Sequence, residues 1–385
     1  MYVSKVAIKN WRNFTKATVN LFETTYIIGP NASGKSNFLD VFRFMRDIVK
    51  PSGGGLQQSI ESRGGLTKVR SLAARKDPRV ELEFELSEAK TDPSMPAAWR
   101  YALSIVSEKG GRNRAIVDKE EVYRDGERIL KRPRPEDDLK DRVLLTQTHL
   151  EQINMNSEFR PIAEFFQDVL YLHLVPQLLK YSNQIMLPMV ESDPFGQKFL
   201  EEIAKTSPRT RESRLRRIQD IIRKVVPNFE ELKFERDQSS GKPHLVMRYN
   251  HWRPKAGWQR EDQFSDGTLR LIALVWTMLT TNKLILLEEP ELSLHKRVVE
   301  QIPQLIYKAK KSRKQAGNQI LISTHSEDIL SSKSITGNFL ILRPGNAGES
   351  TEIMEPSEND KLALKSGLSP ADVLLPQTSS CIGDI

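Results

Sequence analysis

The stretch Gly29-Pro30-Asn31-Ala32-Ser33-Gly34-Lys35-Ser36 decides how the rest of the chain is interpreted. It fits the pattern G-x-x-x-x-G-K-[ST] at every position, between a predicted strand at 25–28 and an apolar, helically spaced segment at 38–49. Glycines let the backbone curl so that consecutive N–H groups point at a phosphate, and the start of a helix adds partial positive charge. The stretch therefore predicts a nucleotide-binding loop.

Two side chains of this loop have specific expected contacts. Lys35 is expected to reach the outer phosphates, and the Ser36 hydroxyl is expected to ligate Mg²⁺. ATP and Mg²⁺ are therefore the predicted cofactors. The loop residues expected to bind nucleotide are Gly29, Asn31, Ala32, Ser33, Gly34, Lys35, Ser36 and Asn37.

Two acidic residues follow the apolar run at 284–287. A buried strand that delivers acids at its carboxyl end is where an α/β sheet places its ligand chemistry. Glu288 is expected to hold Mg²⁺, directly or through water. Glu289 is expected to orient or deprotonate the attacking water, and is therefore a predicted catalytic residue.

Two further segments fit the same kind of site. Phe264–Arg270 (FSDGTLR) is a small-residue turn that opens a helix, which is an anion-binding geometry. Ile322–Ser326 (ISTHS) is a predicted strand that ends near His325. A lone histidine is more often structural, but its position after a buried strand favours a catalytic role at the γ-phosphate.

Composition excludes several classes of protein. The chain has 385 residues, with 58 Lys and Arg against 50 Asp and Glu and a formal charge of +8. With 38% hydrophobic residues it is not a disordered tail protein, and no stretch approaches the ~20 apolar residues of a membrane span. The N-terminus lacks a signal-peptide core, and Cys381 is the one cysteine. We therefore expect a cytoplasmic protein with no membrane partner and no disulfide.

In chain order, GPNASGKSN, FSDGT, LLEEPE and STHS resemble the Walker A, signature, Walker B and switch-histidine segments of ABC-type ATPases. NWRNF at 10–14 resembles the N-terminal element of the SMC/RecF/OLD branch. The phrases GPNASGKSN and FSDGTLRLIAL are similar to stand-alone OLD-like AAA ATPases of bacterial phage-defence systems. The resemblance covers about 1–90 and 240–345, and not the helical middle.

The resemblance implies an α/β fold: an ABC-ATPase-like P-loop head, in which helices flank a mixed sheet, with a helical insertion. The expected domains are an N-terminal ATPase lobe with Walker A at 1–138 and a helical insertion at 139–235. A C-terminal ATPase lobe with signature, Walker B and switch histidine is expected at 236–360, and a tail at 361–385.

The resemblance also implies composite sites between subunits. Ser265 and the amides around Gly267 are expected to face the γ-phosphate bound by a second copy, in a homodimer or higher homo-oligomer. Arg12 is expected to contact nucleotide in its own subunit. A magnesium-sensing glutamine is expected between the phosphate loop and the signature, and Gln147 and Gln177 are both candidates.

Two positions depart from the family pattern. Glu288 stands where aspartate is usual, and its extra methylene predicts indirect contact with magnesium and slow hydrolysis. Asp266 replaces a glycine of the signature, as is common in this branch, and adds negative charge near a phosphate site.

These features predict a hydrolysing ATPase that is the sensor or motor subunit of an anti-phage defence or DNA-transaction complex. OLD proteins normally continue into a TOPRIM nuclease domain, but the sequence after His325 is short and has no D-x-D. We therefore expect a separate effector, a nuclease or toxin, and no nuclease activity in this chain. DNA or RNA is a possible further partner, at the basic segment 209–224. The alternative is a nucleotide-gated scaffold with negligible turnover that sequesters a toxin.

Overall fold

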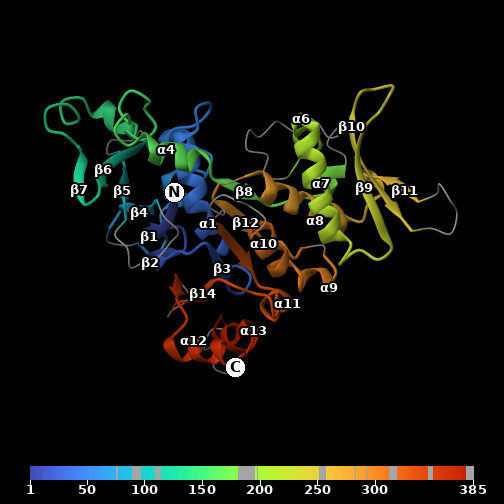
Figure 1. The fold of residues 1–385 in the computed structure, drawn as a ribbon. Helices are drawn as coiled ribbons and strands as arrows, with labels where there is room; N and C mark the ends of the chain where they lie inside the picture. Colours follow the sequence, from blue (N-terminus) through green and yellow to red (C-terminus); the bar gives the residue numbers. More distant parts are fainter. Residues whose placement is uncertain are drawn as a thin grey trace.

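The computed structural model contains an antiparallel N-terminal sheet and a mostly parallel core sheet, with a helix between them (Figure 1). The structure describes residues 1–74, 77–88, 97–108, 114–180, 196, 198–250, 257–281, 283–292, 294–311, 319–345 and 350–378. Cys381 therefore lies outside the described residues. Among the described helices, none is both long and apolar enough to cross a bilayer.

The N-terminal sheet has the strand order β2-β1-β4-β5-β6-β7, and every pairing is antiparallel. The alternation of apolar and acidic residues in 80–86 predicts a half-buried strand, and Val80, Leu82, Phe84 and Leu86 are indeed buried there. The strands are β1 (Tyr2–Trp11), β2 (Phe14–Asn20), β4 (Val80–Ser87), β5 (Trp99–Ser107), β6 (Ala115–Arg124) and β7 (Glu127–Arg132).

The core sheet has the order β15-β14-β3-β13-β12-β8, in which only the β14–β15 pair is antiparallel. Its carboxyl ends therefore bring the phosphate loop after β3, the acids of β12 and the histidine after β13 to one edge. The strands are β3 (Thr24–Ile28), β8 (Leu170–Leu172), β12 (Ile285–Glu288), β13 (Ile320–Thr324), β14 (Asn338–Pro344) and β15 (Thr351–Met354).

Each face of the core sheet packs against a different hydrophobic core, which fixes the register of its strands. Leu286 and Leu321 join α1 (Lys35–Val49) and the N-terminal sheet in one core. Ile285 and Ile322, which alternate with them, join α8 (Asp266–Thr280) in the other. The predicted P-loop head, with helices on both faces of a mixed sheet, is confirmed.

The segment 139–235 is less uniformly helical than the sequence predicts. It supplies β8, the edge strand of the core sheet, and β9 (Phe229–Arg236), which pairs with β10 (Pro243–Tyr249). A three-residue strand is too short to show a period of two, so β8 leaves no pattern in the sequence. Its helices are α4 (Arg160–Gln167), α5 (Pro176–Lys180), α6 (Phe199–Lys205) and α7 (Pro208–Ile222), with a 3₁₀ turn, η1 (Arg142–Thr146).

The predicted basic helix at 209–224 is α7 (Pro208–Ile222), whose apolar residues are buried against α8 and β9. Several of its cations already have partners. Arg211 lies over Phe234 with 4.0 Å between guanidinium and ring centre, and Arg216 lies 4.0 Å from Glu212. Much of its charge is therefore engaged within the chain.

The remaining elements are mostly short helices. The helix predicted at 295–311 is two helices, since Pro303 has no N–H to bond the preceding turn. The tail contains short helices that lie beside the core sheet in Figure 1. These elements are α2 (Leu56–Glu61), α3 (Leu66–Val69), β11 (Trp258–Arg260), η2 (Glu261–Gln263), α9 (Lys296–Val299), α10 (Ile302–Lys311), α11 (Glu327–Leu330), α12 (Glu358–Lys365), α13 (Pro370–Leu374) and η3 (Leu375–Thr378).

Candidate functional site

The phosphate loop connects β3 to α1 in a conformation that few residues adopt. Ala32 and Gly34 both have left-handed backbones, with φ of 63° and 98°. The Lys35 ammonium folds back over the loop and donates to the carbonyls of Gly29 and Pro30, at 2.9 Å each. The lysine is thus held on backbone oxygens of the same loop that is expected to wrap the phosphates.

Asn13, in the turn after β1, fixes the loop from outside. Its Nδ2 donates to the Ser33 carbonyl at 3.2 Å and to Thr351 Oγ1 at 2.6 Å. Its Oδ1 accepts from Asn37 Nδ2 at 2.8 Å. Asn13 and Thr351 are therefore positioning residues that the sequence analysis missed, since they lie far apart in the chain.

Replacing Gly34 by alanine is expected to destabilise the protein by about 2–4 kcal/mol. A Cβ there meets Asn13 Nδ2 at 1.9 Å, and its backbone φ of 98° strains any L side chain. Gly126 in the β6–β7 turn has a φ of 85° with nothing within 4 Å of its Cβ position. Gly126→Ala is therefore expected to lose only about 1–2 kcal/mol in urea unfolding. Equal losses of stability in Gly34→Ala and Gly126→Ala would show that the close contact with Asn13 adds nothing to the cost.

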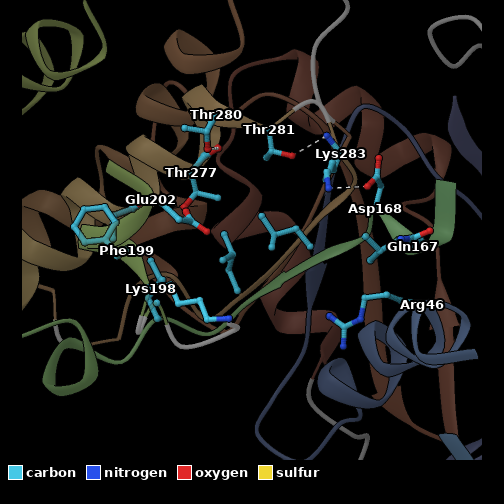
Figure 2. A pocket seen from close by; sticks show the side chains of 16 residues that line it. Arg46, Gln167, Asp168, Lys198, Phe199, Glu202, Thr277, Thr280, Thr281 and Lys283 are labelled. Atoms are coloured by element: carbon cyan, nitrogen blue, oxygen red, sulfur yellow. Dashed lines mark hydrogen bonds and ion pairs between the residues drawn. The ribbon is translucent and has the colours of Figure 1, made fainter. Parts of the chain in front are cut away.

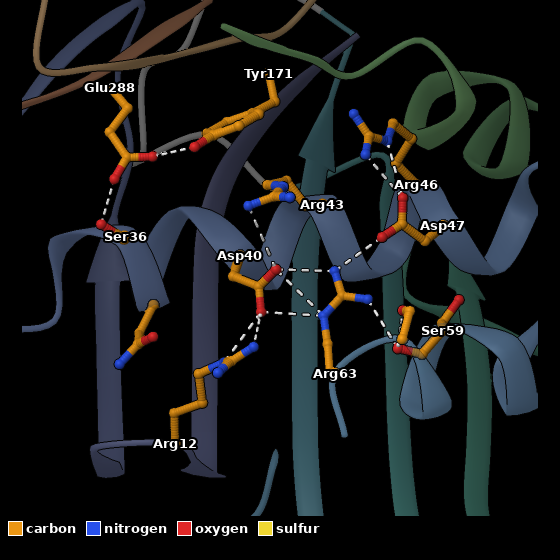
Figure 3. A network of polar contacts seen from close by, with 12 residues as sticks. Arg12, Ser36, Asp40, Arg43, Arg46, Asp47, Ser59, Arg63, Tyr171 and Glu288 are labelled. Atoms are coloured by element: carbon orange, nitrogen blue, oxygen red, sulfur yellow. Dashed lines mark hydrogen bonds and ion pairs between the residues drawn. The ribbon is translucent and has the colours of Figure 1, made fainter. Parts of the chain in front are cut away.

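The carboxylate at the end of β12 faces the start of α1 (Figure 3). Glu288 Oε1 accepts a hydrogen bond from the Ser36 hydroxyl, and Oε2 accepts one from the Tyr171 hydroxyl of β8. Burial, together with this bond, raises the pKa of Tyr171, so that its hydroxyl keeps the proton it donates. A hydroxyl and a carboxylate that meet beside a phosphate loop are the hard oxygen donors that Mg²⁺ prefers, so these residues fit the ion.

The second acid meets the histidine at the neighbouring strand end. Glu289 has a φ of 42°, and its N–H donates to the Ser323 carbonyl at 3.0 Å. Its Oε1 lies 3.2 Å from His325 Nδ1. Glu291 is buried below them and accepts from Thr324 Oγ1 at 2.7 Å, and this burial raises its pKa. The structure thus brings the predicted pair Glu289 and His325 together.

The signature segment begins α8. The Ser265 hydroxyl accepts from the Thr268 N–H at 3.1 Å and so caps the helix. Asp266 pairs with Lys180 at 2.6 Å and accepts from Gln177 at 3.3 Å, so its negative charge is balanced. Gly267 lies in the first turn of this helix.

The two candidate glutamines lie in different places. Gln177 follows β8, the strand beside β12, and touches the signature through Asp266. Gln147 lies after η1, where its carbonyl accepts from the buried Arg132 of β7 at 2.9 Å. The position of Gln177 is the one that adjoins the predicted motifs.

An arginine-rich cavity of about 570 Å³ lies beside Ser36 and Asn37. Arg12 and Arg63 both donate to the buried carboxylate of Asp40, at 2.8 and 2.9 Å (Figure 3). Burial opposes ionisation of Asp40, but the guanidinium groups of Arg63, Arg12 and Arg43 together outweigh it and hold its pKa below the usual range. The structure therefore places Arg12 at the edge of the loop, held by a carboxylate that the sequence analysis missed.

A second cavity, of about 360 Å³, lies on the α8 side of β8 (Figure 2). It contains none of the predicted site residues, and Lys283 in its wall pairs with Asp168 at 2.6 Å.

The loop, the strand-end acids and the histidine together define an ABC-type ATPase of the SMC/OLD kind. Residues 25–331 match the family described as "AAA domain, putative AbiEii toxin, Type IV TA system". This match covers more than half of the chain, which therefore belongs to that family. ATP and, as is usual for such enzymes, Mg²⁺ are the ligands that the family implies.

Solved structures of SMC heads share the fold. The SmcHead bound to the C-winged helix domain of ScpA has a TM-score of 0.56 at 14% identity, over 94% of this chain and 100% of that chain. An Smc head domain with an extended coiled coil, bound to the C-terminal domain of ScpA derived from Pyrococcus furiosus, has a TM-score of 0.50 at 14% identity, over 95% and 98%. At this identity the likeness shows the fold alone.

One short sequence match joins the chain to a named protein. Endonuclease GajA of Bacillus cereus (strain VD045) is 47% identical over 47 residues, which are 12% of this chain and 8% of GajA. The match spans a small part of both proteins, so GajA's activity is not transferred with it.

Proposed function

We propose that the chain binds Mg²⁺-ATP at the 29–37 loop and hydrolyses it slowly at an interface between two copies. The observation that carries this proposal is the meeting of Ser36 with Glu288 and of Glu289 with His325, at the adjoining ends of β3, β12 and β13. Membership of this family supports ATP as the substrate. The finer assignments below are proposals about individual residues.

Lys35 leaves the carbonyls of Gly29 and Pro30 to bind the outer phosphates. Ser36 and Glu288 are the residues that would hold Mg²⁺, and the ion would neutralise charge that develops on the phosphates. Glu289, oriented by His325, accepts a proton as general base from the water that attacks the γ-phosphorus. The bond from that phosphorus to the β–γ bridging oxygen breaks, and ADP leaves with this oxygen. The extra methylene of Glu288 supports slow turnover, because the longer side chain favours indirect contact with the cation.

Arg12 contributes to nucleotide binding from the side. The cavity that it shares with Ser36 and Asn37 is open beside the loop and is large enough for a nucleoside. Arg12 is held there by Asp40, through its Nε and Nη2 atoms. We propose that the nucleoside end of ATP enters this cavity.

Ser265 and Gly267 of a second copy complete the site over the γ-phosphate. The ion pair of Asp266 with Lys180 supports a phosphate beside the signature, because an unpaired carboxylate there would repel that phosphate. ATP would then hold two copies together, and hydrolysis would release them.

Mixing two inactive variants tests the composite site. Lys35→Met and Ser265→Arg are each expected to abolish hydrolysis, whereas a 1:1 mixture is expected to regain about one quarter of wild-type sites, because random pairing makes half of the dimers mixed. A mixture of Lys35→Met and Glu289→Gln is the control. Those two residues act in the same subunit, so no intact site forms. Failure of the first mixture to regain turnover, with mixed dimers demonstrated, would contradict the composite site.

The biological role proposed for this ATPase is that of a sensor or motor in anti-phage defence, acting with a separate nuclease or toxin. GajA, which shares a short stretch with the chain, is named an endonuclease, and the description of the matched family names a toxin, so both similarities support a role beside a nuclease or toxin. DNA cleavage by the purified chain with Mn²⁺ would contradict the separate effector. The domains proposed for this role are the lobes at 1–138 and 236–360, joined by the segment 139–235.

The alternative function is a nucleotide-gated scaffold that holds a toxin with negligible turnover. The observation in its favour is that both oxygens of Glu288 are engaged by protein hydroxyls. Steady-state ATP hydrolysis that Glu289→Gln abolishes distinguishes the ATPase from the scaffold.

A further inference from the structure

Tyr171 is buried beside the proposed metal site and belongs to none of the recognised motifs. It lies on β8, where it pairs in register with Leu286 of β12. Leu286 and Glu288 are two residues apart on β12, so the side chains of Tyr171, Leu286 and Glu288 share the face toward α1. The hydroxyl of Tyr171 thereby reaches Oε2 of Glu288 (Figure 3).

The bond matters because a glutamate has more freedom than the aspartate usual at this position. Its extra methylene adds a rotatable bond, and without a restraint the carboxylate would adopt several orientations. With Oε2 occupied by Tyr171, Oε1 is the oxygen turned toward Ser36. Tyr171 of β8, the strand next to Walker B, thus restrains the longer side chain of Glu288.

The aromatic ring of Tyr171 is itself held in place. The guanidinium carbon of Arg43 lies 4.1 Å from the ring centre, in a cation–π contact. Arg43 in turn lies 4.0 Å from Asp40, the carboxylate that binds Arg12 and Arg63. Contacts therefore continue from the arginine-rich cavity to the carboxylate at the end of β12.

We propose that Tyr171 is a positioning residue that orients Glu288 for the divalent cation, an inference that rests on the proposed Mg²⁺-ATP site. Side chains that hydrogen-bond a metal ligand from outside commonly change metal affinity by 10–100-fold when they are removed. Tyr171→Phe keeps the ring under Arg43 and removes only the hydroxyl. Its effect therefore reports on the bond to Glu288.

The test measures metal binding directly, with Mn²⁺ as the probe. The 385-residue chain is saturated with a non-hydrolysable ATP analogue, and free Mn²⁺ is followed by its electron paramagnetic resonance signal. Tyr171→Phe is expected to bind Mn²⁺ about 10- to 100-fold more weakly than wild type. Affinity for the analogue in EDTA is expected to stay within about twofold, since no metal is present to be positioned. The control is Tyr123→Phe, which removes a 3.0 Å hydroxyl bond to Glu121 on the N-terminal sheet.

Each outcome decides a different point. Wild-type Mn²⁺ affinity in Tyr171→Phe would overturn the positioning role and leave the proposed function intact. Loss of analogue binding in EDTA would also overturn it, because the tyrosine would then support the loop fold instead. A wild-type protein that binds neither the analogue nor Mn²⁺ would show that the proposed function itself is wrong.

Discussion

Replacing Glu289 by glutamine is expected to lower kcat for ATP hydrolysis by about 10²–10⁴-fold, the range that a general base supplies. Glutamine has the same shape, and the backbone N–H of residue 289 still reaches the Ser323 carbonyl, so the strand end keeps its conformation. What disappears is the negative charge, and with it the basicity, of the carboxylate that lies 3.2 Å from His325. Affinity for ATP is expected to stay near the wild-type value.

This variant also separates binding from turnover. If ATP joins two copies, Glu289→Gln is expected to accumulate as an ATP-bound dimer that light scattering detects, whereas wild type returns to its starting state as ATP is consumed. Glu235→Gln, an exposed position on β9, serves as a control with unchanged turnover. Turnover retained by Glu289→Gln would show that another group accepts the proton.

The fold was predictable because its signals are local. The phosphate loop needs eight consecutive residues, and each buried strand of the parallel sheet is a short apolar run that ends in polar residues. Parallel strands then bring the residues after Ile28, Leu287 and Ser323 to one edge without any knowledge of distant contacts. The β8 strand lacked such a signal, since only three residues pair.

The supporting residues were not predictable, because their contacts join distant parts of the chain. Asn13 meets Thr351 across almost the whole sequence, and Tyr171 meets Glu288 from another strand. Asp40 is the exception that left a local signal. It is an acid within the otherwise apolar, buried run at 38–42 of α1, and a buried acid requires a cationic partner. The sequence does not indicate that this partner is Arg63 together with Arg12.

Replacing Lys35 by methionine is expected to weaken ATP binding by at least about 100-fold, because hydrogen bonds from a cation to phosphate oxygens each contribute about 1.5–3 kcal/mol. Stability of the nucleotide-free protein is expected to change by less than about 1 kcal/mol. Burial lowers the pKa of Lys35, although Glu289, Glu291 and Glu288 oppose this shift, so removing the charge relieves a desolvation penalty. That relief offsets the loss of two bonds to backbone carbonyls.

Thermal unfolding with and without ATP distinguishes this functional lysine from a structural one. Ligand at 100 times Kd stabilises the wild type by about 2.7 kcal/mol, and Lys35→Met is expected to lose nearly all of that gain. Lys310 is the matched control, since it also donates to a backbone carbonyl, that of Glu23, at 3.0 Å near the other end of β3. Lys310→Met is expected to unfold more easily yet keep the full ATP-dependent gain. The prediction is wrong if Lys35→Met loses as much stability as Lys310→Met and still binds ATP like the wild type. The bonds of Lys35 to Gly29 and Pro30 would then be structural, and the loop would bind phosphate without the lysine.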